Sequence, residues 1–398
     1  MFVKYNSVLI SIFGIIIGGC SGFLAFLILP YIPLPVNSPL LSAIGIEKPR
    51  IIGFLPYFLT SRATNNYNPY ITTLSYFALT IDTDGHIVKL TNPQQEDPGW
   101  YDLQTATVQK KLTNAKNNNV TLSLTVGQQD EASISALLSD PVTHANNLLS
   151  DVIPVMKKYG FSDLNIDIES FQNADAKKEQ QFITFVQTIK QGLQKQNMGT
   201  VTLDISPEAF IKPYLIDPVK VGKIVDYMLV MAYDYHTVLS SNTGPIAPLS
   251  GAGKETEYDV TTTINIAKRE IDPKKIILGM PLYGYEWDSL SNIPGSATIP
   301  DTGVTASNRR ITDVFIPSCT TCVVKEDYLA QEPDYIFQDK KGDPYFHQAF
   351  LFNTNAYAKR ITFAKDNNFA GVALWALGYE GNTLLTPTTS YKNSFNLQ

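Results

Sequence analysis

In the stretch 160 to 169, GFSDLNIDIE, of this 398-residue chain, Asn165, Asp167 and Glu169 alternate with Leu164, Ile166 and Ile168. Successive side chains of a β-strand point to opposite faces, so Asn165, Asp167 and Glu169 share one face and the aliphatic residues between them share the other. The pattern therefore predicts a strand with one face for packing and one for chemistry.

Two arrangements fit this alternation. On the pattern alone the commoner one is a half-exposed antiparallel strand with its carboxylates in water. The alternative is a strand of a closed parallel barrel, with its aliphatic side chains against outer helices and its carboxylates near the carboxyl-terminal mouth. Two inward carboxylates would push their pKa values apart, so that one stays protonated near neutral pH. Glycoside hydrolysis needs a protonated acid that donates to the leaving oxygen and a nearby negative charge that stabilises the oxocarbenium-like centre.

The rest of the chain favours the barrel. Eight runs of strand length span residues 51–58, 73–81, 120–126, 163–169, 201–206, 225–233, 275–283 and 371–377. Helical patterns lie between several of them, over 103–115, 182–193 and 260–267 and after the helix-start pair Asp140-Pro141. Strands alternating with helices pair in parallel, so the sequence predicts an α/β fold, a (β/α)8 TIM barrel over residues 50–398. Buried carboxylates are costly in a barrel unless they serve a function, which favours an active site.

Residues 286–350 interrupt the alternation before the last strand. They are rich in Ser, Thr, Pro and Asp and contain short strand-like pieces. We expect a small insertion domain beside the barrel mouth that supplies one wall of a groove.

The amino-terminal region predicts a membrane anchor. Residues 8–29 carry no charge and are long enough to cross a bilayer, so residues 1–30 are expected to form a cytoplasmic tip and a transmembrane helix. Lys4 precedes the span and the next cations are Lys48 and Arg50, which places the rest of the chain outside the cytoplasm. A cleaved signal peptide, or a lipoprotein lipidated at Cys20, is the alternative. The repeated prolines of residues 31–49 predict a semi-rigid stem.

Composition and charge limit the classes of binding partner that the chain could have. A net charge of −6 and a pI near 5.3 give no support for nucleic acid, whereas an uncharged polysaccharide remains open. None of the 4 histidines pair at ligand spacing, so we expect no metal and no cofactor. Cys319 and Cys322 form a C-x-x-C that could be redox-active or half a zinc site, but outside the cell a local disulfide is favoured.

Four motifs resemble glycoside hydrolase family 18, the chitinase family. Its fourth strand carries DxxDxDxE, where this chain has Ser162, Asn165, Asp167 and Glu169, so the last two acids match and the first two do not. The other matches are Met231, Tyr233 and Asp234 to M-x-Y-D on strand six, Gly279, Pro281, Tyr283 and Gly284 to G-x-P-x-Y-G on strand seven, and Trp375 to the tryptophan of strand eight. The insertion resembles the α+β insertion that many members carry between strands seven and eight.

The resemblance implies a substrate-assisted retaining mechanism. Glu169 would protonate the glycosidic oxygen while the substrate's own 2-acetamido carbonyl attacks the anomeric carbon. Asp167 would accept a hydrogen bond from the acetamido N–H and stabilise the cyclic oxazolinium. Tyr233 would donate to the acetamido oxygen, Asp234 would contact the sugar, and Trp375 would form an apolar floor. Glu169 would then act as base for the water that opens the ring.

The remaining motif positions, Asn165, Met231 and Tyr283, are expected at the substrate site, with Tyr283 packing rather than reacting. Asn165 can hydrogen-bond Asp167 but cannot share a proton with it, so the sequence predicts that the pKa coupling of an acid pair is lost. Asn at this position resembles the N-x-D-x-E variant of the bacterial spore-cortex and cell-wall branch, which cleaves peptidoglycan. His236 is expected to be structural.

The sequence thus predicts a membrane-anchored, monomeric glycosidase that hydrolyses β-1,4-linked N-acetylglucosamine polymers, either chitin or peptidoglycan. The alternative is a non-hydrolytic, lectin-like protein on the same fold. Retention of Glu169 favours the enzyme, because inactive family members commonly lose that acid.

Overall fold

The computed structural model describes residues 48–254, 256–318, 322–326, 330, 332–337, 344–381 and 385–394. The predicted membrane span, most of the predicted stem, and Cys319 lie outside these residues. Within the described part of the chain, no helix is long and apolar enough to cross a membrane. Nearly all of it belongs to one compact unit, Pro49–Tyr391, and Lys48 and residues 392–394 fall outside this unit.

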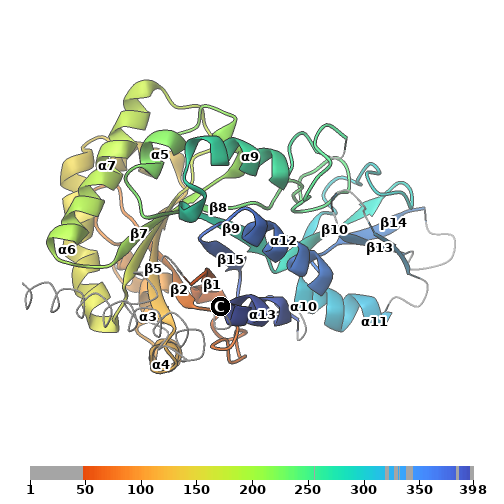
Figure 1. Ribbon diagram of the computed structural model, residues 1–398, viewed down its shortest axis with the longest axis horizontal. Coiled ribbons are helices and arrows are strands. Elements are labelled where there is room, and N and C mark those ends of the chain that lie inside the picture. The colour runs from red at the N-terminus through yellow and green to blue at the C-terminus, as the bar shows by residue number, and fades with distance from the viewer. Residues whose placement is uncertain are drawn as a thin grey trace, which may run out of the picture. The chain divides into compact units, whose positions relative to one another are not determined.

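Eight parallel strands close into a barrel, confirming the predicted TIM barrel (Figure 1). In order around the barrel they are β1 (Arg50–Pro56), β2 (Thr73–Thr80), β5 (Thr121–Gln128), β6 (Asp163–Ile168), β7 (Thr200–Ile205), β8 (Tyr227–Val230), β9 (Ile276–Pro281) and β15 (Gly371–Trp375). All eight correspond to predicted runs. β8 is shorter than its run of 225–233, because the backbone leaves the sheet in tight turns, with Ala232 N–H bonded to Val230 O and Tyr233 N–H to Met231 O.

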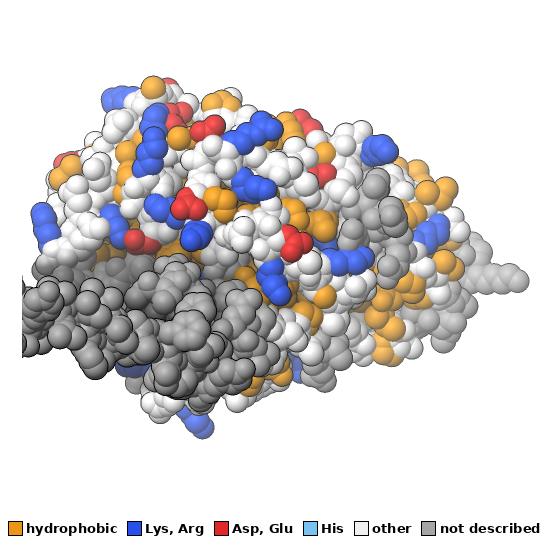
Figure 2. Space-filling view, viewed as in Figure 1, with side chains coloured by type: hydrophobic (Ala, Val, Ile, Leu, Met, Phe, Trp, Pro, Cys, Tyr) orange, Lys and Arg blue, Asp and Glu red, His pale blue; other side chains and the backbone are white. Residues whose placement is uncertain are grey.

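Helices follow most of the strands and cover the barrel. They are α3 (Pro98–Leu103), α4 (Ala106–Asn117), α5 (Glu131–Leu137), α6 (Pro141–Tyr159), α7 (Ala176–Lys195), α8 (Pro218–Gly222), α9 (Val260–Glu270), α12 (Thr354–Asp366) and α13 (Thr386–Ser394). Asp140 caps α6 as predicted, and Gly160 ends it with a left-handed φ of 80°. The face of the molecule in Figure 2 carries interspersed basic and acidic side chains over these helices.

Short elements complete the barrel unit. They are the single-turn 3-10 helices η2 (Tyr57–Leu59), η3 (Pro207–Phe210) and η4 (Pro273–Lys275) and the hairpin of β3 (Leu90–Asn92) and β4 (Gln95–Glu96). Of these, η3 matters most for function, because it directly follows β7 at the barrel mouth and lines the cavity described below.

The insertion between β9 and β15 is a five-stranded antiparallel sheet in the order β11-β10-β14-β13-β12. Its elements are β10 (Tyr283–Ser289), β11 (Val304–Ser307), α10 (Asn308–Arg310), the π-helix η5 (Ile311–Phe315), α11 (Ile316–Ser318), β12 (Val323–Glu326), β13 (Pro333–Phe337) and β14 (Phe346–Phe350). Only Leu282 separates β9 from β10, so the sheet starts at Tyr283, ahead of the predicted start at 286. Cys322 is disulfide-bonded.

A buried ion pair ties the insertion to the barrel. Arg360 of α12 donates to Glu332 Oε1 at 3.1 Å and to the carbonyl of Ala330 at 2.8 Å. The Glu332 carboxylate in turn accepts the backbone N–H groups of Ile246 and Ala247 at 3.0 and 2.9 Å. The pair therefore joins α12, the start of β13 and the loop that follows β8.

The burial of residues 163–169 distinguishes a barrel strand from a half-exposed antiparallel strand. Leu164, Ile166 and Ile168 are fully buried, and on the alternate face Asn165 and Asp167 are 0% and 3% exposed. The β5 and β7 neighbours of Asn165 in register, Thr125 and Thr202, are buried as well. Both faces of β6 are covered, as in a barrel strand, and the half-exposed antiparallel alternative is excluded.

Candidate active site

The predicted site residues gather at one rim of the barrel. Glu169 follows the end of β6, while Met231, Tyr233 and Asp234 follow the end of β8. Tyr283 follows β9, and Trp375 is the last residue of β15. All strands run in the same direction, so their carboxyl ends meet at the face where TIM-barrel active sites lie. Asn165 and Asp167 lie deeper, within β6 itself.

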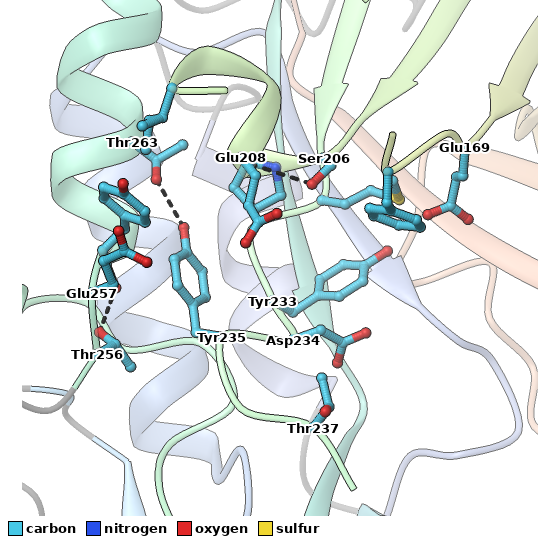
Figure 3. Close-up of a pocket in the computed structure, with 15 residues that line it drawn as sticks. Glu169, Ser206, Glu208, Tyr233, Asp234, Tyr235, Thr237, Thr256, Glu257 and Thr263 are labelled. Carbon is cyan, nitrogen blue, oxygen red and sulfur yellow. Dashed lines mark hydrogen bonds between the residues drawn. The ribbon is translucent and has the colours of Figure 1, made fainter. Parts of the chain in front are cut away.

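A cavity of about 360 Å³ opens at this rim, and Glu169, Met231, Tyr233 and Asp234 line it. Figure 3 shows the Glu169 carboxyl group and the Tyr233 hydroxyl directed toward the same part of the cavity, with Asp234 beside them. The wall farther from β6 comes from η3 and from the segment that leads into α9. The cavity has the size expected for a small-molecule or oligosaccharide site.

Glu169 is the best-placed proton donor. Burial raises its pKa above the ordinary range of a glutamate; a hydrogen bond from Gln129 Nε2 at 2.7 Å opposes the rise, and the charge of Asp234 adds to it. A carboxyl group with a raised pKa keeps its proton to higher pH and can deliver it inside a cavity.

Asp167 belongs to a buried acid pair that the sequence did not predict. Burial raises its pKa well above the ordinary aspartate range, and the charge of Glu169 adds to the rise. Asp204 on β7 is also buried, and burial followed by the charge of Asp167 raises its pKa in the same way. Asn165 itself cannot titrate, but the neighbouring strand supplies a second acid that the sequence analysis did not include. Asn165 acts on Asp204, whose pKa it lowers.

Asp234 is held by two tyrosines. Tyr283 and Tyr285 donate their hydroxyl protons to the same oxygen, Asp234 Oδ1, at 2.6 and 2.7 Å. Burial raises the pKa of Asp234, and these hydrogen bonds oppose the rise. The backbone of Asp234 has a left-handed φ of 63°, which turns its side chain toward β10. Tyr283 and Tyr285 thus hold Asp234 in place, and Tyr285 is an addition to the residues that the sequence predicted.

Tyr233 presents a protonated hydroxyl. Burial, then the charges of Asp204 and Asp234, raise its pKa well above the ordinary tyrosine range. Its ring lies against Gly279, where a Cβ would be 3.0 Å from a ring carbon and 2.8 Å from the backbone oxygen of Val230, so the strand-seven motif has no room for a side chain here. Tyr233 is therefore a fixed hydrogen-bond donor.

Trp375 is positioned by aromatic packing at the end of β15. Its ring meets those of Phe77 and Phe54 edge-on, with centroids 4.5 and 5.6 Å away. Met231 packs against the same apolar cluster in the barrel. Both residues are partly buried, so each can present some surface to a ligand.

Phe171 is a second residue that the sequence did not predict. It lines the cavity just beyond Glu169, is 58% exposed, and meets the ring of Tyr214 edge-on at 6.3 Å. His236 is buried, and its Nδ1 lies 2.9 Å from the carbonyl of Pro245, consistent with the structural role expected for it. Across the described ranges no cluster of His, Cys, Asp or Glu is suited to hold a metal ion.

Comparison with known proteins agrees with this geometry. The family described as "Glycosyl hydrolases family 18" matches residues 50–380. The cortical fragment-lytic enzyme of Bacillus anthracis is 24% identical over 324 residues, covering 79% of this chain and 67% of the relative.

Two solved structures share the fold. The group IV chitinase of Ostrinia furnacalis superposes with a TM-score of 0.72 at 20% identity, over 88% of this chain and 100% of the chitinase chain. The spore cortex-lytic enzyme SleL of Bacillus megaterium gives a TM-score of 0.66 at 19% identity, over 86% of this chain and 74% of its own. Because the family match spans nearly the whole described barrel and its insertion, this chain belongs to the glycosyl hydrolases of family 18.

Proposed function

We propose that this protein hydrolyses β-1,4-linked N-acetylglucosamine polymers, either chitin-like or peptidoglycan, by substrate-assisted retaining catalysis. The observation that carries the proposal is Glu169, an acid with a raised pKa at the mouth of a 360 Å³ cavity and close to the buried Asp167. A protonated acid beside a second carboxylate is what cleavage of a glycosidic bond requires.

In the first step Glu169 donates its proton to the glycosidic oxygen, and the carbonyl oxygen of the substrate's acetamido group attacks the anomeric carbon. The leaving alcohol takes the proton, and an oxazolinium ring forms on the sugar. Asp167 accepts a hydrogen bond from the acetamido N–H and stabilises the positive charge of this ring. In the second step Glu169 takes a proton from water, which attacks the anomeric carbon and restores the acetamido group.

The other residues of the rim orient the sugar. Tyr233, with its raised pKa, donates a hydrogen bond to the acetamido oxygen as that oxygen approaches the anomeric carbon. Asp234, fixed by two tyrosine hydroxyls, accepts from a sugar hydroxyl. Trp375 and Met231 supply apolar surface for the faces of the ring, and Asn165 lies two residues before Asp167 on the same face of β6.

The names of the relatives support both candidate polymers. One relative is a cortical fragment-lytic enzyme and another solved neighbour is a chitinase. We also propose that residues 8–29 anchor the protein in a membrane with the barrel outside the cytoplasm, because this run carries no charge. Extraction of membranes at alkaline pH tests the anchor: the full chain should stay in the pellet, and release into the supernatant would refute it.

The test of catalysis uses the full chain in detergent, incubated with chitooligosaccharides and, separately, with peptidoglycan. New reducing ends are counted for the wild type, for Glu169→Gln, and for the control Glu96→Gln, which alters an exposed glutamate on β4. Removal of the general acid is expected to lower the rate by about 10² to 10⁴-fold, with the control unchanged. Equal, negligible release by all three proteins with sugar binding intact would refute the proposal and indicate a lectin-like protein.

A further inference from the structure

We propose that Asp204 is a positioning residue that carries a proton and donates a hydrogen bond to the Asp167 carboxylate. Asp204 on β7 would thereby supply the acid that is absent at position 165, where this chain has Asn165. The inference rests on the proposed function, since Asp167 is the group that must be charged and oriented during catalysis. It concerns a residue on β7, outside the four motifs that mark the family in this chain.

Strand register places the two acids side by side. Asn165 pairs with Thr202 and Ile166 with Leu203, which is the last pair between β6 and β7. Asp167 and Asp204 are the next residues on the two strands, and the charge of Asp167 acts on Asp204. Residues in register on parallel strands point to the same face, and neighbouring strands lie about 4.8 Å apart. Both carboxyl groups therefore project into the barrel interior at the same level.

Burial prevents both acids from being charged. Asp167 is 3% exposed and Asp204 is 4% exposed. Within the part of the chain that the structure describes, neither Asp167 Oδ1 nor Asp204 Oδ1 accepts a hydrogen bond. Two adjacent buried carboxylates repel each other, and a proton between them removes one charge and supplies a donor for the other. A shared proton is thus the arrangement that satisfies the pair.

The surroundings of Asp204 favour the proton on that residue. The charged groups that act on Asp204 are Asp163 and Asp167 from β6 and Glu169 just beyond it, while Tyr233 from the segment after β8 is a neutral hydroxyl. Burial and the negative charges of the three acids favour the protonated form of Asp204, and the Asn165 amide opposes them with a smaller effect than burial. Asp167 lies closer to Glu169, where its charge is needed against the oxazolinium.

The proposal has a defined consequence for pH dependence. A donor to the charged form of Asp167 lowers its pKa, so removing the donor raises it. Asp167 must be charged for catalysis, and activity is lost as the pH falls through its pKa. Loss of the Asp204 proton donor therefore moves the acidic side of the kcat profile to higher pH.

The experiment compares Asp204→Ala, Asp204→Asn and the double variant Asp204→Ala with Asn165→Asp. We expect Asp204→Ala to lower kcat by about 10- to 100-fold, as for one hydrogen bond to a charged group, and to shift the acidic side upward. Asp204→Asn keeps an N–H donor, so its effects should be smaller. The double variant supplies an acid on β6 itself and should recover most of the loss.

The matched control is Asp163→Asn. Asp163 is also a buried aspartate, but it lies at the other end of β6 and accepts hydrogen bonds from Ser123 and Thr202 at 2.7 and 3.0 Å. The Asp163 charge is the weakest of those that act on Asp204, and its substitution removes no donor to Asp167. We therefore expect it to lower thermal stability and to leave the acidic side of the kcat profile in place. An Asp204→Ala protein with the wild-type profile, or a double variant no better than the single one, would overturn the proposal.

Infrared spectroscopy of the full chain tests the proton without requiring turnover. In a Glu169→Gln background at neutral pH, the C=O band of a protonated, buried carboxyl group should be present, vanish with Asp204→Asn, and persist with Asp163→Asn. A missing band would refute the shared proton even in an active enzyme. An inactive wild type that shows the band would refute the proposed function and leave the acid pair standing.

Discussion

Gln129 should set the upper pH limit of catalysis through its contact with Glu169. Its Nε2 donates to Glu169 Oε1 at 2.7 Å, and this hydrogen bond lowers a pKa that burial raises. The proton donor must be protonated, so activity falls as pH rises through the pKa of Glu169. Replacing Gln129 with alanine removes a donor to the charged form, raises that pKa, and extends activity to higher pH.

The size of the effect follows from the exposure of Gln129. A hydrogen bond to a charged group is worth about 1.5 to 3 kcal/mol when it is not replaced. Gln129 is exposed, so water takes over part of the interaction, and we expect about half of that value. At a pH on the alkaline side, kcat/KM is divided by its value at the pH optimum of the same protein. This ratio should be about 3- to 10-fold higher for Gln129→Ala than for the wild type.

The assay is a pH profile of kcat/KM with a soluble chitooligosaccharide, because this quantity reports the ionisation of the free enzyme. The control is Gln172→Ala, which alters another exposed glutamine on the segment after β6 and should keep the wild-type profile. An unchanged alkaline side in Gln129→Ala, or a shift to lower pH, would show that Glu169 is not the group whose ionisation limits the rate.

Three further substitutions test other parts of the structure. Tyr285→Phe removes one of the two tyrosine hydroxyls that donate to Asp234, so kcat/KM should fall by about 10-fold, and a wild-type value would contradict this role. Phe171→Ala removes an exposed cavity aromatic, so KM should rise about fivefold while thermal stability stays unchanged. Arg360→Met removes the cationic partner of the buried Glu332 carboxylate and should lower the free energy of unfolding, measured in urea, by about 3 to 5 kcal/mol. The double variant with Glu332→Gln should recover part of this loss.

The barrel could be predicted because each strand carries a local signal. Alternation over 163–169 and apolar runs of strand length elsewhere located all eight strands, and Asp140 marked the start of α6. The end of β8 could not be located in this way, because Met231 and Tyr233 continue the apolar pattern while hydrogen bonds between neighbouring residues turn the backbone out of the sheet.

The additional site residues depend on contacts between distant segments. The run VTLDIS places Asp204 on the same face as Thr202, a signal that is visible in the sequence, but its pairing with Asp167 depends on strand register, which local sequence does not set. The hydrogen bond from Tyr285 to Asp234 joins β10 to the segment after β8, which is about 50 residues earlier in the chain. Phe171 lies in the loop after β6, where the sequence has no periodic pattern. Its exposed position in the cavity could therefore not be predicted from the sequence.

The short passage from β9 into β10 limits how the insertion can be exchanged between related enzymes. Tyr283 and Tyr285 belong to the insertion sheet, yet their hydroxyl groups fix Asp234 at the barrel mouth. A chimera joined at residue 286 would keep both tyrosines from the host, whereas one joined after Pro281 would import whatever the donor carries at these two positions. The first junction preserves the hydrogen bonds to Asp234, and the second makes them depend on the donor sequence.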